Sequence, residues 1–403
     1  MFRLLLLLVF AGISPAIIAA AHGQSFSDLE FALRDHPSLQ VMAYQAEASD
    51  ERATAATSLP DPVISAGINN FPIFDPSFTD FLPTNKSIGI QQKFPSLAGR
   101  NARAGEAIAR ANETREMRAQ RYAALRGELI ALLHEKHRTH VQRGLAEERR
   151  AKYDELTQVA ELEIDAGRPA LFRLAEIEGE RAEVDRALVV LAGEVAQIDA
   201  RLIDLVGAVP DTAPPPVLPI DWSGDAMAFH AARVADAGVA VRDRGIDEAK
   251  AAWKPEWGAQ LTYQQREAGR NFAGDDWVSG TVSVTVPFWA SKNQEPRLRA
   301  AKAERAAARA NYSAAARTAS AQYSTYRSMR RTAEQSAAVL SEKIVAIEDE
   351  ITSQNTIYES GVGDYAPIID GEIAILKLRS DIAGEQARIA TATARMNALL
   401  VTQ

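Results

Sequence analysis

The feature that most constrains this chain is a stretch of helix-favouring sequence, from about Ala98 to Asp165, that no proline interrupts. Gly127 and Gly144 stand isolated within it, and no cluster of turn-forming residues divides it. At 1.5 Å per residue, a helix of this length measures roughly 100 Å, several times the diameter of a small domain. Only 7% of the residues are aromatic and alanine is abundant, which favours long helices over a globular α/β enzyme core.

The last helical stretch of each half of the chain carries a narrow apolar stripe. In the first half its spacing alternates between three and four residues, with a break at Arg181; in the second it is strictly seven. The stripes comprise Leu174, Ile177, Val184, Leu188, Leu191, Val195, Ile198, Leu202 and Leu205, and then Ile368, Ile375, Ile382, Ile389 and Met396. Stripes this narrow pack helix against helix, as in a coiled coil, and do not build a thick core.

The same order of features occurs twice along the chain. Each half runs from helical sequence to a proline-marked break, two alternating segments, a long helix, a glycine break and a final helix. Matching landmarks are Pro60 and Pro255, Pro95 and Pro287, ARAN at 109–112 and 308–311, and Gly167 and Gly361. We expect one repeat over 24–207 and a second over 222–403. The proline-rich stretch 208–221 between them is typical of an extended, exposed linker.

Four short segments alternate between apolar and polar residues, at about 62–71, 87–94, 256–264 and 278–286. Each has about the length of a tilted membrane strand, with one side suited to lipid and the other to a water-filled lumen. A soluble sheet with one solvated face would alternate in the same way. Four strands cannot close a barrel, since even small ones need about eight. Several copies would therefore have to share one barrel.

The first residues predict export. Arg3 precedes an apolar run, and the small residues Ala21 and Gly23 frame a cleavage site, so we expect a signal peptide over 1–23. The sequence has no cysteine, which excludes disulfides and lipid attachment to a cysteine. No later stretch approaches the ~18 apolar residues of a membrane-spanning helix. A net charge of −8 argues against binding nucleic acid.

Taken in order, these features resemble the TolC family of outer-membrane factors. The resemblance covers nearly the whole mature chain and rests on the repeat, the strand pairs that end in Phe-Pro or Val-Pro, and the glycine before each final helix. Leu59-Pro60-Asp61-Pro62 and the stretch from Ile88 to Pro95 look most like the branch that serves heavy-metal efflux pumps. Unlike lipidated members, this chain lacks the cysteine.

The resemblance implies a mainly α fold with a small β-barrel portion. Three subunits would form a long coiled-coil helical barrel below a twelve-stranded membrane barrel, in the outer membrane and extending into the periplasm. It further implies passive export of solutes, heavy-metal cations among them, with a periplasmic adaptor and an inner-membrane pump as partners. Alternatives are a drug-efflux or type I secretion channel, or a soluble periplasmic coiled-coil adaptor.

The resemblance also suggests a periplasmic gate. Family members often place two acidic residues, three apart, at the start of the last helix. Here Pro367 occupies the first position and Asp370 the second, with Asp364 on the preceding turn. The matching residues of the first half are Arg173 and Glu176. A ring of carboxylates from Asp370 and Asp364 would favour cations, whereas acids at a helix start also simply stabilise the helix dipole.

His134, His137 and His140 form a ladder on the long helix. Imidazoles so spaced are weak candidates for a zinc or copper site, and solvated helix residues are the simpler interpretation. The sequence has no glycine-rich phosphate loop, no His-Glu-x-x-His and no Gly-x-Ser-x-Gly motif. We therefore expect neither catalysis nor a bound cofactor.

Overall fold

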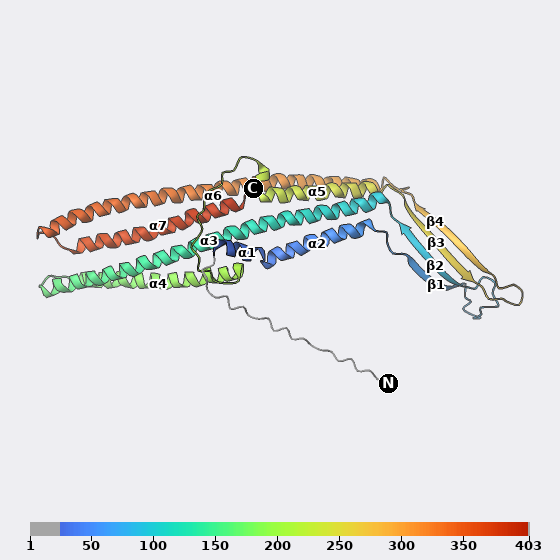
Figure 1. Cartoon of the computed structure of the whole chain (residues 1–403), viewed down its shortest axis with the longest axis horizontal. Coiled ribbons are helices and arrows are strands. Elements are labelled where there is room, and N and C mark those ends of the chain that lie inside the picture. The colour runs from blue at the N-terminus through green and yellow to red at the C-terminus, as the bar shows by residue number, and fades with distance from the viewer. Residues whose placement is uncertain (1–24, 402–403) are drawn as a thin grey trace, which may run out of the picture.

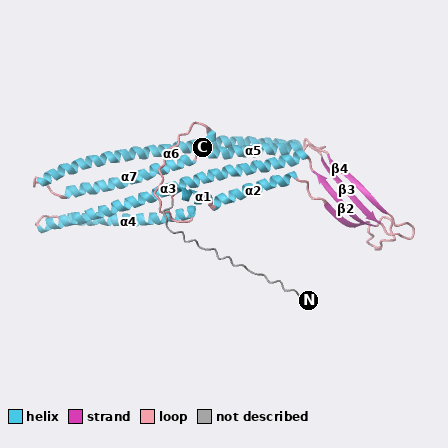
Figure 2. Ribbon diagram, viewed as in Figure 1, coloured by secondary structure: helices cyan, strands magenta, loops and turns pink. Residues whose placement is uncertain are grey.

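The computed structural model describes residues 25–401, so the predicted signal peptide lies outside the described residues. The molecule is elongated, with helices along most of its length and a sheet at one end (Figures 1 and 2). Its elements are α1 (Phe26–Arg34), α2 (Pro37–Thr57), β1 (Val63–Asn69), β2 (Asn85–Phe94), α3 (Leu97–Asp165), α4 (Leu171–Val206), a 3₁₀ turn (Ala226–Ala228), α5 (His230–Ala251), β3 (Glu256–Gln265), β4 (Asp276–Thr285), α6 (Gln294–Glu359) and α7 (Ala366–Ala398). The predicted fold class, mainly helical with a small four-stranded sheet, is confirmed.

Two long helices, α3 and α6, run from the sheet to the opposite end, which we call the tip. The shorter helices lie beside them in end-to-end pairs, α2 and α4 along α3, and α5 and α7 between α3 and α6 (Figure 1). The result is a layer of helices with α2 and α4 at one edge and α6 at the other. None of the described helices is both long enough and apolar enough to cross a membrane.

Local signals set the helix ends. The Ser96 side chain accepts a hydrogen bond from the Gly99 backbone N–H and caps α3. At the tip, Gly167 and Gly361 adopt φ of 78° and 77° in the turns after α3 and α6. L-residues rarely adopt such angles, so glycine allows both chain reversals.

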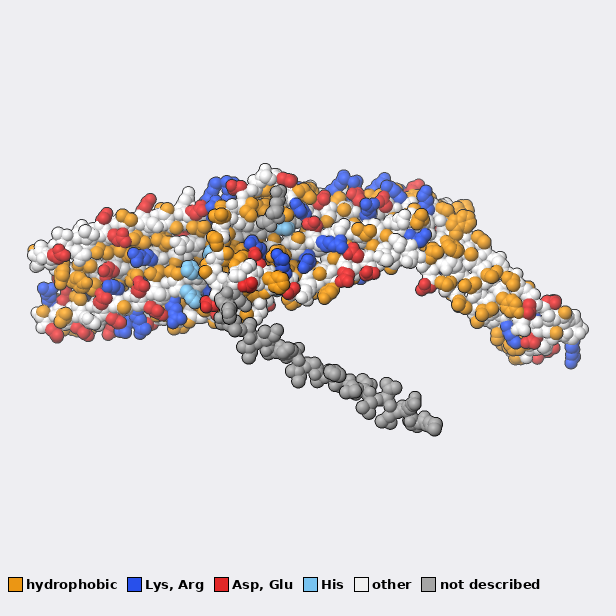
Figure 3. Space-filling view, viewed as in Figure 1, with side chains coloured by type: hydrophobic (Ala, Val, Ile, Leu, Met, Phe, Trp, Pro, Cys, Tyr) orange, Lys and Arg blue, Asp and Glu red, His pale blue; other side chains and the backbone are white. Residues whose placement is uncertain are grey.

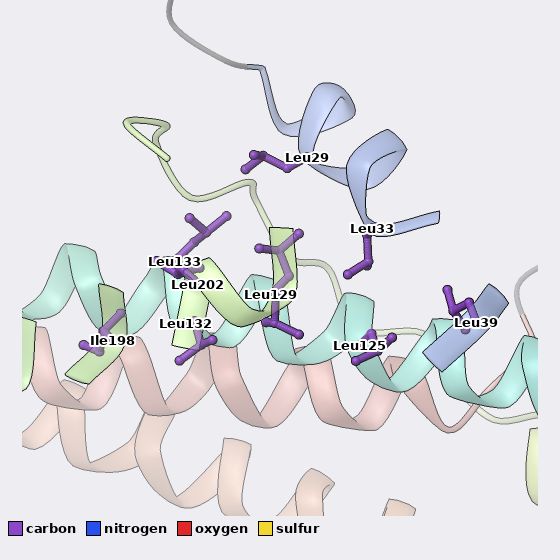
Figure 4. Close-up of a cluster of buried hydrophobic side chains, with 10 residues drawn as sticks. Leu29, Leu33, Leu39, Leu125, Leu129, Leu132, Leu133, Ile198 and Leu202 are labelled. Carbon is purple, nitrogen blue, oxygen red and sulfur yellow. The ribbon is translucent and has the colours of Figure 1, made fainter. Parts of the chain in front are cut away.

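The core consists of helix-to-helix contacts, as the apolar stripes predict. Ile198 and Leu202 of α4 pack with Leu129 and Leu133 of α3, and Leu29 and Leu33 of α1 cover the same cluster (Figure 4). Ile177 and Val184 continue this contact towards the tip. At the break in the stripe, Arg181 forms an ion pair with Asp154 of α3 at 3.3 Å. In α7, Ile368, Ile375 and Met396 are buried.

Residues 208–222, which we call the belt, cross the helices in an extended conformation. The Pro215 carbonyl oxygen lies 3.0 Å from His134 Nε2 of α3. Asn397 of α7 donates to the Leu218 carbonyl at 2.8 Å, and the Tyr323 hydroxyl of α6 donates to the Ile220 carbonyl at 3.0 Å. The belt is therefore attached to three helices.

Candidate channel surfaces and tip ion pairs

The sheet is antiparallel in the order β1-β2-β3-β4, and its register sorts the side chains onto two faces. Ile64, Ile90 and Leu261 lie in one row across three strands. The apolar face comprises Ile64, Ala66, Ile68, Ile88, Ile90, Phe94, Trp257, Ala259, Leu261, Tyr263, Val278, Val282 and Val284. Its large side chains are exposed, Val282 to 75%. A face this apolar and this open needs an apolar environment or a partner.

The opposite face of the sheet is polar and almost uncharged. It carries Ser65, Ser87, Gln91, Gln260, Thr262, Gln264, Ser279, Thr281 and Ser283, with glycine at 67, 89 and 258. Its only charged residues are Lys93 and Glu256, beside the helices. The sorting has few exceptions: Gln92 lies on the apolar face, with Lys86, Gln265 and Asp276 at its far end, and Val63 and Trp277 lie on the polar face. This nearly complete separation of apolar and polar faces matches a wall between lipid and water.

Aromatic and charged groups bound the apolar face at both ends. At the helix end, Phe94 and Trp257 are register partners, and the exposed rings of Phe288 and Trp289 pack edge to face at 6.2 Å between centroids. At the far end Lys86 pairs with Glu267 at 2.7 Å. The arrangement resembles the aromatic belts found where membrane proteins meet the lipid head groups.

Both edges of the molecule are open. β1 and β4 each pair on one side only, and the helices that follow the same edges expose apolar residues. Val41 and Tyr44 of α2, Val189 of α4, and Val339 and Val345 of α6 are each more than half exposed. Unpaired strand edges and exposed apolar stripes invite association with further chains.

At the tip, two ion pairs join the two halves of the chain. Arg168, in the α3–α4 turn, lies 3.3 Å from Asp364 in the α6–α7 turn, measured between Nη1 and Oδ1. One helical turn into each following helix, Arg173 Nη2 donates to Asp370 Oδ2 at 2.8 Å. Both predicted gate acids thus have an arginine partner within the same chain. The Asp370 side chain remains 53% exposed.

Further charged contacts hold α7 to α3 near the tip. Lys152 Nζ forms ion pairs with Glu372 at 2.9 Å and with Glu155 at 3.0 Å, and these contacts raise the pKa of the Lys152 ammonium. The Tyr153 hydroxyl bonds to Glu180 of α4 at 3.2 Å. Burial, with Glu180 nearby, raises the pKa of Tyr153 to about 12. Lys152 therefore stays charged and Tyr153 neutral at physiological pH.

The arginine partners were missed from sequence, although Arg173 was recognised as the counterpart of a gate position. The histidine ladder lies far from the tip. His134 contacts the belt, and burial lowers its pKa, while His137 and His140 are exposed. Within residues 25–401, no group of three or more His, Cys, Asp or Glu side chains could hold a metal ion.

No family profile matches the sequence, and no curated protein sequence does. Solved structures do match. CusC, from a study of its folding and transmembrane channel formation, aligns with a TM-score of 0.77 at 13% identity, over 93% of this chain and 92% of that one. The outer-membrane channel OprN gives a TM-score of 0.74 at 17% identity, over 92% and 88%.

The outer membrane protein VceC of Vibrio cholerae gives a TM-score of 0.73 at 15% identity, over 92% of this chain and 94% of that one. The chain has the TolC-like outer-membrane channel fold. In this channel fold the sheet with its two chemically distinct faces and the tip with its ion pairs lie at opposite ends of the helices. Identities this low describe the fold and leave the cargo open.

Proposed function

We propose that three copies of this chain form an outer-membrane efflux channel of the TolC family. The observation that carries the proposal is a two-faced sheet that continues into a layer of helices, with both layers open at both edges. Since β1 and α2 share one edge and β4 and α6 the other, copies can join edge to edge. Three copies would supply twelve strands, enough to close a barrel.

In this assembly the apolar face contacts the lipid of the outer membrane and the polar face lines the lumen. Phe288 and Trp289 lie at the inner interface, and the helices extend into the periplasm. This orientation satisfies the exposed apolar face with lipid and leaves the Ser, Thr and Gln face in water. A soluble periplasmic adaptor would leave side chains such as Val282, 75% exposed, in water.

The channel would work passively, with energy from an inner-membrane pump that a periplasmic adaptor connects to it. Carboxylates at the tip, Asp364 and Asp370 among them, favour cationic solutes at the entrance. Together with the sequence resemblance, this supports heavy-metal cations as cargo. Drug efflux and type I secretion are the alternatives within the same channel class.

We also propose that the tip ion pairs form part of a gate. With Arg173 bonded to Asp370 and Arg168 to Asp364, the carboxylates are partly neutralised within each subunit. Breaking these pairs would weaken the contact between the starts of α7 and α4, which the buried Ile369 and Ile177 also hold, and would present the acids to the lumen. The arginines thus modify the predicted acidic ring, because the charge it offers depends on whether the pairs are intact.

Native mass spectrometry in mild detergent and conductance in planar bilayers test the assembly. We expect a trimer that conducts ions and prefers cations. A stable monomer with its full sheet content would contradict the proposal, because it would show that the open edges need no partner. For the cargo, metal resistance of cells that lack the gene would separate metal efflux from drug efflux.

A further inference from the structure

The net charge of helix α6 changes sign along its length. Residues 294–331, on the sheet side, contain nine Lys or Arg and two Glu. Residues 332–359, on the tip side, contain six Asp or Glu and one Lys. Basic side chains gather along the edge over α5 and the sheet-side part of α6 (Figure 3). A random mixture of charges would not divide a single helix in this way.

Much of this charge has no partner within the described chain. Among residues 25–401, Lys302, Arg309 and Arg327 on the sheet side form no ion pair, and neither do Glu342 and Asp349 on the tip side. By contrast, Arg305 pairs with Asp243 of α5, and Glu348 lies 3.9 Å from Arg379 of α7. Arg305 and Glu348 thus pair with neighbouring helices, and Arg299 pairs with Glu295 within α6. The five residues named above have no such partner within residues 25–401.

The opposite edge of the molecule carries the charges that α6 would meet in a ring. On the sheet side this edge is α2, where Glu47 and Glu51 are exposed beside one exposed base, Arg52, and none of the three forms an ion pair within residues 25–401. On the tip side it is α4, which has eight acidic and four basic residues. Glu176 and Glu178 of α4 are exposed and form no ion pair in the described chain. The sheet-side charges of the two edges are therefore opposite, and their tip-side charges are alike.

We propose that the seam between subunits is electrostatically attractive beside the sheet and repulsive beside the tip. This rests on the proposed ring, in which α6 of one copy meets α2 and α4 of the next. Opposite charges on helices in contact attract, and like charges repel by similar amounts. Attraction beside the sheet would then stabilise the contact between subunits. Repulsion beside the tip would favour separation of the subunit tips and oppose the contacts that keep the subunits together.

Charge reversals on the two parts of α6 test this inference in trimers in mild detergent at low salt. Lys302→Glu with Arg309→Glu should increase the fraction of dissociated subunits about tenfold, since exposed charge pairs are individually modest. The matched variant Asp349→Lys with Glu350→Lys changes the charge by the same magnitude and should decrease that fraction. Adding Glu47→Lys and Glu51→Lys to the first variant should restore the trimer.

Salt provides the internal control. Screening lengths fall from ~10 Å at 0.1 M to ~3 Å at 1 M, so both effects should shrink at high salt. Spin labels at Val362 should report shorter distances between tips in the Asp349→Lys, Glu350→Lys trimer than in the wild type. Effects in the same direction for both reversals, or effects that survive 1 M salt, would overturn the seam inference and leave the channel intact. A monomeric wild type would overturn both proposals.

Discussion

The sheet end and the tip end of this molecule are held together by different forces. Three continuous antiparallel ladders join the four strands of the sheet, whose polar face has charges only at Lys93 and Glu256. Near the tip, the two halves of the chain meet through a buried cluster that includes Ile177 and Ile369. At the extreme tip they meet through exposed ion pairs such as Arg168–Asp364, whose side chains are 63% and 65% exposed. Backbone ladders are costly to break, whereas exposed ion pairs contribute only about 0–1 kcal/mol each. The two turns at the extreme tip, which carry Arg168 and Asp364, are therefore the part of the molecule that can rearrange.

The largest expected effect lies in the helical body, where burial rather than charge holds the structure. Leu202 is fully buried between α3 and α4, so Leu202→Ala should cost about 2–5 kcal/mol of unfolding free energy. Leu171→Ala, at the tip, is the matched control because Leu171 is 72% exposed. We expect the unfolding free energy of Leu171→Ala to lie within about 0.5 kcal/mol of that of the wild type. Denaturant unfolding in detergent measures both, and equal losses would remove the distinction between body and tip.

The next effect concerns the two faces of the sheet. Leu261→Arg on the apolar face should cost roughly 2–4 kcal/mol near the membrane midplane, because the charge would lie in lipid. The adjacent Thr262→Arg places the same charge on the polar face and should assemble normally. Heat-stable trimer in outer-membrane fractions reports assembly. Equal tolerance at both positions would show that the sheet is solvated on both faces.

Substitutions at the tip should change stability less than those in the helical body or the sheet. Their main effect should be on conductance. Asp370→Asn should alter unfolding by less than about 1 kcal/mol, because the pair with Arg173 is exposed. It should leave trimer formation unchanged, weaken cation selectivity and blunt block by multivalent cations in planar bilayers. Arg173→Gln breaks the same pair but keeps the acid, so it should raise the open fraction while retaining selectivity. If only Asp364→Asn changes either property, the gate rests on that residue instead.

The smallest effect concerns the histidines. Replacing His134, His137 and His140 with Gln should leave metal resistance unchanged at normal protein level. His134 contacts the belt, His137 and His140 are exposed, and within residues 25–401 no group of three or more His, Cys, Asp or Glu side chains could hold a metal ion. A large loss of resistance would make the ladder a functional site.

Acid should weaken the belt region slightly. Burial lowers the pKa of His134 and of His230 below their ordinary value of 6.5. The unfolded chain therefore binds protons that the folded chain does not, so stability is complete above about pH 6.5 and decreases as the pH falls below it. Thermal unfolding between pH 7.5 and 5 should show a smaller decrease in His134→Gln than in wild type. An identical pH profile would mean that His134 is already free to protonate.

The sequence predicted the helices and strands because the regular spacing of apolar residues in each element involves only nearby positions of the chain. The apolar positions Ile64, Ile88, Leu261 and Val284 alternate with polar ones, and the structure places all four on one face. Long-range pairs leave no such trace. Arg173 and Asp370 lie 197 residues apart, and His134 lies 81 residues from Pro215. No helical or strand period connects those positions, so the tip pairs and the attachment of the belt emerged only from the structure.

The unequal continuity of the helices has a mechanical consequence. Midway along the molecule α3 and α6 continue unbroken, while α2 gives way to α4 and α5 to α7 (Figure 1). At that level α3 and α6 are continuous, whereas the α2–α4 and α5–α7 pairs are interrupted. Fewer helices therefore resist bending there than elsewhere along the body. The segment from 208 to 222 crosses there, bonded to His134, Tyr323 and Asn397. Sideways movement of the tip would therefore bend α3 and α6 at this level.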